Sequence, residues 1–181
     1  MFKRMMFGLV PIKVTWIIIA SCVLLVLILI LSLGACVGST STPTTPKPSE
    51  PIKATWLEPN VVGDDVSIPV SGIESKKIIH FRIGTSAGDI AFMAYELDKK
   101  IYVLSNVCPP CRSIGFSLQK DVLVCDTCAT QFNAKTGDGI KGACVAFPKA
   151  SVPYEIRGDT IIMKRNDLTT AYQNTLKPGW P

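Results

Sequence analysis

The stretch CPPCRSIGFSLQKDVLVCDTC, residues 108–128, decides how this chain is expected to fold. It holds two Cys-x-x-Cys pairs, Cys108 with Cys111 and Cys125 with Cys128, separated by thirteen residues. Two residues between paired cysteines let both sulfurs of a loop bind one metal ion, and two such loops complete a tetrahedral sulfur site. The spacing is therefore a specific signal for a site that uses all four cysteines.

Three chemistries could use these four thiols. A zinc site would be closed and structural, whereas an iron–sulfur cluster would take the same thiolates and carry electrons. The spacing alone does not separate these two. The third chemistry is thiol–disulfide exchange at Cys108 and Cys111, or two structural disulfides in an oxidising compartment, although no βαβ pattern accompanies the motif.

Short β-strands are expected on both sides of the cysteines. Alternating or β-branched runs predict strands at residues 66–70, 78–83, 90–97, 100–104, 122–124, 154–157 and 160–164. The pairs Asp98-Lys99 and Gly158-Asp159 predict tight hairpin turns between neighbouring strands. One helix is expected at residues 168–176, with Asp167 as its N-cap. The fold class is therefore mainly β and antiparallel, with a helix at the C-terminal end.

The N-terminal 36 residues predict a membrane attachment. Residues 16–33 form an almost unbroken apolar run, about long enough to cross the hydrocarbon core as a helix. Three basic residues and no acidic residue precede it, which places the start of the chain in the cytoplasm and the remainder outside. Leu33-Gly34-Ala35-Cys36 also matches a bacterial lipobox, so Cys36 is a candidate for lipidation. A transmembrane anchor and a lipoprotein signal both tether the protein to the cell membrane.

The rest of the chain divides into a spacer, one domain and a tail. Residues 37–59 are rich in Ser, Thr and Pro and predict an extended linker, residues 60–166 a metal-binding β domain, and residues 167–181 a C-terminal helix and tail. Of 19 lysines and arginines, three precede the apolar run, which leaves 16 against 14 acidic residues. This near balance argues against a nucleic-acid partner.

The segment after the second cysteine pair resembles the Rieske family. The residues that follow the order of that family are Phe132, Asn133, Thr136, Gly137, Pro148, Pro153, Tyr154 and Gly158. In the Rieske pattern two of the four ligands are histidines. Here Cys111 and Cys128 stand at those places, and His80, the only histidine, lies on an early strand. The resemblance implies a Rieske-like or rubredoxin-like β domain with an all-cysteine site.

A closer resemblance, over residues 76–164, is to the FtrD-like family of membrane iron–sulfur proteins. It rests on both Cys-x-x-Cys pairs, Gly115-Phe116, Phe132, and Gly142-Ala143-Cys144 before Pro148. The chain departs from the family pattern at Ala129, where a glycine is usual, and in having one hydrophobic span where many members have several. The resemblance implies an extracytoplasmic cluster-binding domain, in some members linked to iron uptake with a permease.

Cys144 is the fifth thiol of the domain and could serve as an alternative ligand or be a buried small residue. Arg112 and Lys135 lie close to the thiols in sequence and are expected to be solvated surface charges. No nucleophile with a histidine nearby, no carboxylate pair in a motif and no phosphate loop is present, so no catalytic residue and no small-molecule substrate is predicted.

The sequence as a whole therefore predicts a membrane-tethered iron–sulfur electron carrier. The expected ligands are Cys108, Cys111, Cys125 and Cys128, and the expected partners are redox proteins or an iron permease in the membrane. A structural zinc-ribbon module that binds a partner in a membrane complex is the alternative, and a dithiol–disulfide oxidoreductase is the third possibility. Iron and zinc differ in colour and in redox activity, which makes metal content the deciding observation.

Overall fold

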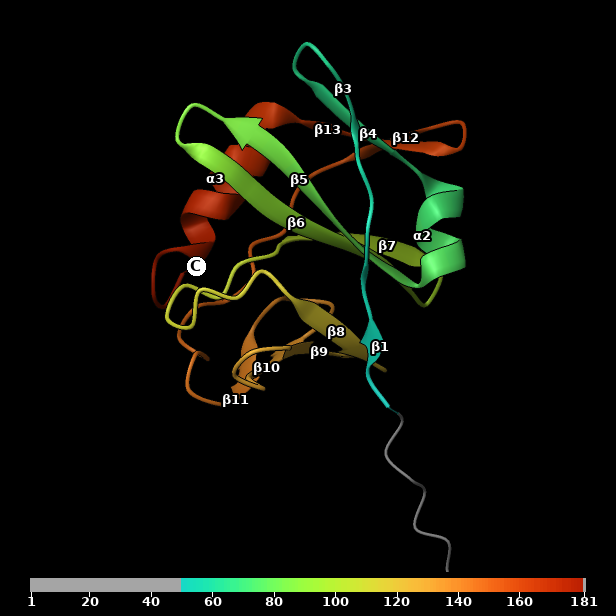
Figure 1. The fold of residues 1–181 in the computed structure, drawn as a ribbon. Helices are drawn as coiled ribbons and strands as arrows, with labels where there is room; N and C mark the ends of the chain where they lie inside the picture. Colours follow the sequence, from blue (N-terminus) through green and yellow to red (C-terminus); the bar gives the residue numbers. More distant parts are fainter. Residues whose placement is uncertain (1–49, 181) are drawn as a thin grey trace, which may run out of the picture. The chain divides into compact units, whose positions relative to one another are not determined.

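The computed structural model describes residues 50–180. Strands dominate this part of the chain, and every strand pair is antiparallel except that of β2 with β5 (Figure 1). The prediction of a mainly antiparallel β fold is thus confirmed. The predicted membrane segment, Cys36 and the linker up to residue 49 lie outside the described residues. Within residues 50–180, neither helix is long and apolar enough to cross a bilayer.

A central sheet runs through the middle of the domain in the order β2-β5-β6-β7. Its strands are β2 (Thr55–Trp56), β5 (Ile78–Thr85), β6 (Gly88–Leu97) and β7 (Lys100–Ser105). Successive residues of a strand point to opposite faces, and here both faces are buried. Phe92 and Ala94 of β6 pack into one core, whereas Met93 and Tyr95 pack into the other. The central sheet therefore separates two hydrophobic cores.

The first core is closed by a second sheet, in the order β12-β13-β4-β3, and by two helices (Figure 1). These elements are β3 (Asn60–Val62), β4 (Asp65–Pro69), α2 (Val70–Lys76), β12 (Glu155–Arg157), β13 (Thr160–Lys164) and α3 (Arg165–Thr175). Ile68, Ile161 and Leu168 are fully buried in it. The core of this half of the domain contains no cysteine and packs against one face of the central sheet.

The second core is closed by a third sheet, in the order β1-β8-β9-β10-β11. Its strands are β1 (Ile52–Lys53), β8 (Phe116–Gln119), β9 (Val122–Cys125), β10 (Gln131–Asn133) and β11 (Gly139–Lys141). We call it the thiol sheet, because the cysteine loops lie at its strand ends and Cys108, Cys125 and Cys144 belong to the core beneath it. Phe116 and Phe132 meet edge to face there, with ring centroids 5.8 Å apart. The Tyr95 hydroxyl donates to the Ala134 carbonyl and ties the thiol sheet to the central sheet.

The structure has more strands than the sequence predicted, namely β3, β8, β10 and β11 besides those below, and it differs from specific expectations as follows. Residues 52–56, expected in the linker, form β1 and β2 and join two different sheets. Val70, expected to end a strand, begins α2. Asp167 is not the cap of the last helix, because α3 begins at Arg165 directly after β13 and its N-cap, Lys164, makes no side-chain cap bond. Asp167 lies in the first turn instead, where a carboxylate is favourable for the helix dipole.

Candidate metal centre

The first Cys-x-x-Cys loop follows β7 and is closed by its own backbone. The Cys108 N–H donates to the Ser113 carbonyl oxygen at 2.8 Å, and the two residues form an isolated antiparallel bridge. Arg112 turns the chain between them with a φ of 57°. As a result, the Sγ atoms of Cys108 and Cys111 lie within 4.8 Å of each other.

The second loop follows β9 and is built in a similar way. The Cys125 N–H donates to the Thr130 carbonyl oxygen, and the Ala129 N–H donates to the Cys125 carbonyl oxygen, both at 2.9 Å. Ala129 closes the turn with a φ of 55°, in the left-handed region that favours glycine. Both cysteine pairs therefore sit on tight, backbone-bonded turns, as expected for metal-binding loops.

Asp126 anchors the second loop to the thiol sheet. Its carboxylate accepts hydrogen bonds from the Ser117 hydroxyl of β8 and from the Lys53 ammonium of β1, the latter at 2.7 Å. Its backbone N–H donates to the Gly115 carbonyl oxygen at 2.9 Å. The loop that carries Cys125 and Cys128 is thus held to two neighbouring strands.

The two loops bring their sulfurs together. The Sγ atoms of Cys108 and Cys128 are 4.0 Å apart, and those of Cys111 and Cys125 are 3.7 Å apart. All five cysteines of residues 50–180 are free thiols. Sulfurs that approach from two loops without forming a disulfide make a donor set suited to a thiophilic metal.

Cys144 joins the same cluster from a third loop. Its Sγ lies 3.7 Å from that of Cys128, and the thiols within 4.8 Å of one another are Cys108, Cys111, Cys128 and Cys144. Gly142 permits this approach, because its φ is 121° and a Cβ there would lie 2.6 Å from Thr130 Oγ1. Thr130 Oγ1 accepts the Cys144 N–H at 3.3 Å and lies 3.2 Å from Cys128 Sγ. The structure therefore assembles five sulfurs rather than four.

The five thiols differ in burial, and burial and hydrogen bonds shift the pKa of three of them. Cys108, Cys125 and Cys144 are buried, whereas Cys111 and Cys128 are partly exposed. Burial raises the pKa of Cys108 and of Cys125. At Cys128 burial acts in the same direction but is outweighed by hydrogen bonds with Thr130, Cys125 and Cys111, which lower its pKa to about 6. Cys128 therefore ionises more readily than the buried Cys108 and Cys125, and the thiolate is the form that binds a metal ion.

The other charged or polar residues considered from the sequence make no hydrogen bond or ion pair with the sulfurs within residues 50–180. Arg112 and Lys135 are exposed, and Lys135 pairs with Asp98 at 2.6 Å, as expected of solvated charges. His80 is buried on β5, where its ring meets that of Trp56 with centroids 5.2 Å apart. Sequence reasoning missed Thr130 and Lys149, which nothing in the local sequence marks as neighbours of the thiols.

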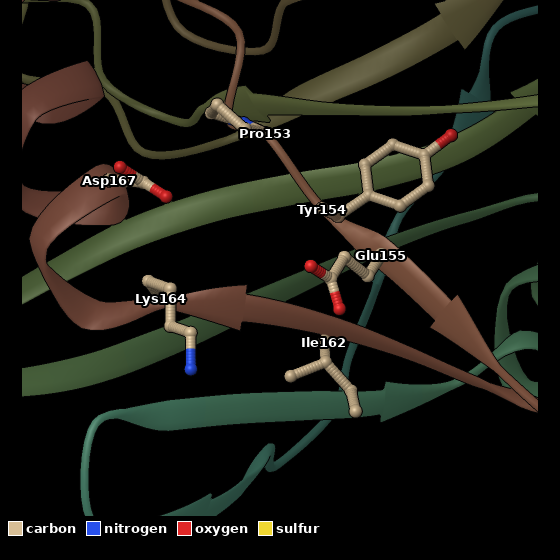
Figure 2. Close-up of a pocket in the computed structure, with 6 residues that line it drawn as sticks. All are labelled: Pro153, Tyr154, Glu155, Ile162, Lys164 and Asp167. Atoms are coloured by element: carbon tan, nitrogen blue, oxygen red, sulfur yellow. The ribbon is translucent and has the colours of Figure 1, made fainter.

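A shallow pocket of about 110 Å³ lies in the other half of the domain (Figure 2). It is lined by Pro153, Tyr154, Glu155, Ile162, Lys164 and Asp167. Lys164 is already paired with Asp65 of β4. The pocket contains neither cysteine nor histidine, so we assign no chemistry to it.

Comparison with solved structures finds chains of low sequence identity. One is a chain of a complex of reduced oxygenase and oxidized ferredoxin in carbazole 1,9a-dioxygenase, with a TM-score of 0.47 and 17% identity, covering 57% of this chain and 95% of the other. Another is a ferredoxin from Sphingomonas yanoikuyae B1, with a TM-score of 0.36 and 18% identity, covering 41% and 74%. No curated protein matches the chain.

A family model covers most of the described domain. It is that of the membrane iron-sulfur containing protein FtrD-like family, and it matches residues 73–174. The matched region contains all five clustered thiols, and their convergence as free thiols fits a metal or iron–sulfur site. With more than half of its length matched, the chain belongs to the FtrD-like family of membrane iron–sulfur proteins.

Proposed function

We propose that this protein is a membrane-tethered, extracytoplasmic iron–sulfur protein that passes single electrons to a partner. The observation that carries the proposal is the convergence of free thiols from three loops in a member of an iron–sulfur family. When bound, an iron–sulfur group would supply one-electron redox chemistry. The basic start and apolar run of the sequence support the outward placement of the domain.

The proposed ligands are the four thiols of the two loops, Cys108, Cys111, Cys125 and Cys128, with Cys144 as the alternative donor. In each of the two short contacts, Cys108 to Cys128 and Cys111 to Cys125, one cysteine of the first loop meets one cysteine of the second. Buried Cys108 and Cys125 would exclude water from one side of the centre, and partly exposed Cys111 and Cys128 would leave the other side within reach of a redox partner. The Rieske-like order of residues after Cys128 supports the same assignment.

The partner that we propose is a membrane redox protein or an iron permease. The support is the membrane iron–sulfur family to which the chain belongs. The near-neutral charge balance of the residues after Cys36 argues against a nucleic acid as the partner. An electron carrier of this kind would adjust the oxidation state of iron before its transport.

A structural zinc module is the second candidate, and the sulfur spacing favours it. Four sulfurs at about 2.3 Å from one ion form a tetrahedron with edges of about 3.8 Å. The Sγ atoms of Cys108, Cys111, Cys128 and Cys144 all lie within 4.8 Å of one another, with contacts of 4.0 Å from Cys108 to Cys128 and 3.7 Å from Cys128 to Cys144, a size that suits a single ion. A dithiol oxidoreductase fits less well, because Cys108 is fully buried with a raised pKa, whereas an attacking cysteine needs an exposed thiolate.

The test is metal analysis of the full chain, expressed and purified in detergent without oxygen. Iron with a matching amount of acid-labile sulfide, together with a visible spectrum that bleaches on reduction, is the expected result. One zinc per chain without sulfide or colour would overturn the electron carrier and establish the structural module. A protein that binds neither metal but has a thiol pair reacting rapidly with disulfides would overturn both.

A further inference from the structure

Lys149 is buried in the core beneath the thiol sheet. It is 1% exposed, and within residues 50–180 it is the only lysine, arginine, aspartate or glutamate that is buried. No carboxylate pairs with it in that part of the chain. Burying an ammonium without a counter-ion is costly, so a buried lysine of this kind calls for a source of negative charge nearby.

The ammonium group is fixed between the loops that carry Cys108 and Cys144. Lys149 Nζ donates to the Val107 carbonyl oxygen at 2.8 Å and to the Phe147 carbonyl oxygen at 2.9 Å. Val107 directly precedes Cys108, and Phe147 lies three residues after Cys144. The two carbonyls orient the ammonium but, being neutral, do not balance its charge.

Aromatic rings complete the surroundings of the ammonium. Nζ lies 4.3 Å from the centroid of the Phe132 ring and 5.4 Å from that of Phe116. These ring faces favour a cation, but a ring carries no net charge and does not balance that of the ammonium. The remaining groups of opposite charge around the ammonium are the thiolates, when they form.

Electrostatics links the lysine to the cysteine cluster. Burial lowers the pKa of Lys149 to about 8, and Cys108, Cys125, Cys144 and Cys111 oppose this shift. Lys149 in turn is the group that opposes the raised pKa of Cys108. The lysine and the cysteines therefore stabilise each other's charged forms across the core.

We propose that Lys149 is the built-in counter-cation of the sulfur centre: its ammonium offsets part of the negative charge that four thiolates retain after they bind a metal group. Four thiolates around a group of charge +2 leave a net charge of −2, and uptake of one electron makes it −3. A fixed cation nearby stabilises both states, and it stabilises the more negative, reduced state more. Lys149 would thus favour loading of the site and raise its reduction potential. The second effect rests on the proposed electron-carrier function, whereas the first holds for zinc as well.

The experiment removes the charge while keeping a polar hydrogen-bond donor. In the full chain, Lys149→Gln replaces the ammonium with a neutral amide on a slightly shorter side chain, Lys149→Arg keeps the charge, and Lys76→Gln removes an exposed charge of the same sign at the end of α2. Zn²⁺ affinity is measured by competition with a chelator, and the midpoint potential is measured by titration of protein loaded with iron and sulfide. Circular dichroism checks folding, and Lys149→Met replaces the Gln variant if the latter does not fold.

We expect Lys149→Gln to bind Zn²⁺ about tenfold more weakly than the parent, with Lys149→Arg and Lys76→Gln within about threefold of it. In iron-loaded protein, the one-electron equilibrium should shift about tenfold toward the oxidised form, which is a fall of about 59 mV in midpoint potential. A merely structural lysine would not move the potential of correctly folded protein. Unchanged Zn²⁺ affinity and unchanged potential in folded Lys149→Gln would overturn the proposal. A parent that holds only zinc would instead overturn the electron-carrier function, while the affinity measurement would still decide the role of Lys149.

Discussion

Gly137 and Lys149 lie backbone against backbone. The Lys149 N–H donates to the Gly137 carbonyl oxygen at 2.9 Å, and a Cβ built on Gly137 would collide with the Lys149 carbonyl oxygen. Gly137 also has a φ of 84°, in the left-handed region. The turn after β10 therefore needs a glycine for two independent reasons, and this glycine allows the segment with the buried lysine to pack beside the thiol sheet.

Gly137→Ala is expected to destabilise the domain strongly. The left-handed backbone costs a non-glycine residue about 1–2 kcal/mol, and forcing a methyl group into a packed site adds about 1–3 kcal/mol. Gly158→Ala is the matched control, since Gly158 has a φ of 60° but nothing within 4 Å of its Cβ position. Urea unfolding of the metal-free chain measures both variants. Equal losses of unfolding free energy would show that the contact with Lys149 has no cost.

Ala129→Gly should stabilise the second cysteine loop. Ala129 is exposed and has a φ of 55°, which a glycine adopts without strain, although the greater freedom of glycine in the unfolded chain offsets part of the gain. We expect a net increase of about 0.5–1 kcal/mol in the free energy of unfolding. Ala143→Gly, at an exposed position without a positive φ, should not increase stability. A loss in Ala129→Gly equal to that in the control would contradict the assignment of strain.

His80 should make stability depend on pH. Burial lowers its pKa from 6.5 to about 4, against the raising effects of Asp126 and of the Phe116 backbone. The unfolded chain then takes up a proton near pH 6.5, whereas the folded chain takes it up only near pH 4. The contribution of His80 is therefore fully present above pH 6.5 and is lost as the pH falls toward 4, by up to about 3 kcal/mol.

The measurement is chemical unfolding of the parent and of His80→Gln between pH 4 and 7.5. Other groups titrate in both proteins, so the difference between their curves isolates the imidazole. The parent should lose more stability than the variant on acidification, with the curves separating below about pH 6.5. Parallel curves across this range would show that the imidazole is accessible to protons in the folded state.

The two candidate ligand sets give opposite results for Cys125 and Cys144. With the proposed ligands, Cys125→Ser should lose most of its bound metal, and Cys144→Ser should keep it, with changes confined to the visible spectrum. Both side chains are buried and the substitution alters only one atom, so the variants are closely matched. Metal content and sulfide per chain measure the effect. Metal lost from Cys144→Ser but kept in Cys125→Ser would identify Cys108, Cys111, Cys128 and Cys144 as the ligands.

Local turn chemistry made part of the fold predictable. Asp98 and Lys99 both have a positive φ, as one of the two common two-residue hairpin turns requires, and they join β6 to β7 as expected. Gly158, with a φ of 60°, begins the two-residue turn that joins β12 to β13, also as expected, but there only the first turn residue has a positive φ. The short α2 was missed because Val70 and Gly72 are poor helix formers and Pro69, its N-cap, makes no side-chain cap bond. Residues 52–56 were missed because their strands exist only through partners far along the chain.

In the candidate site, too, local features could be predicted from the sequence and long-range contacts could not. The spacing of the two Cys-x-x-Cys pairs predicted that two loops would bring sulfurs together. The arrival of Cys144 and the burial of Lys149 could not be predicted, because both depend on close backbone approaches, at Gly142 and Gly137, between segments distant in sequence. A sequence pattern reports the geometry of one turn, whereas these contacts follow from how three loops pack.

The five residues from Ile52 to Trp56 have a mechanical consequence. They enter the folded domain through β1, which pairs with β8, and then through β2, which pairs with β5, and Lys53 also pairs with Asp126 in the second cysteine loop. A pull along the preceding chain would therefore load β1 of the thiol sheet first, and only β8 lies between β1 and β9, the strand that ends in Cys125. Tension on the chain before Ile52 would therefore act on the sheet and on the ion pair that hold the second cysteine loop.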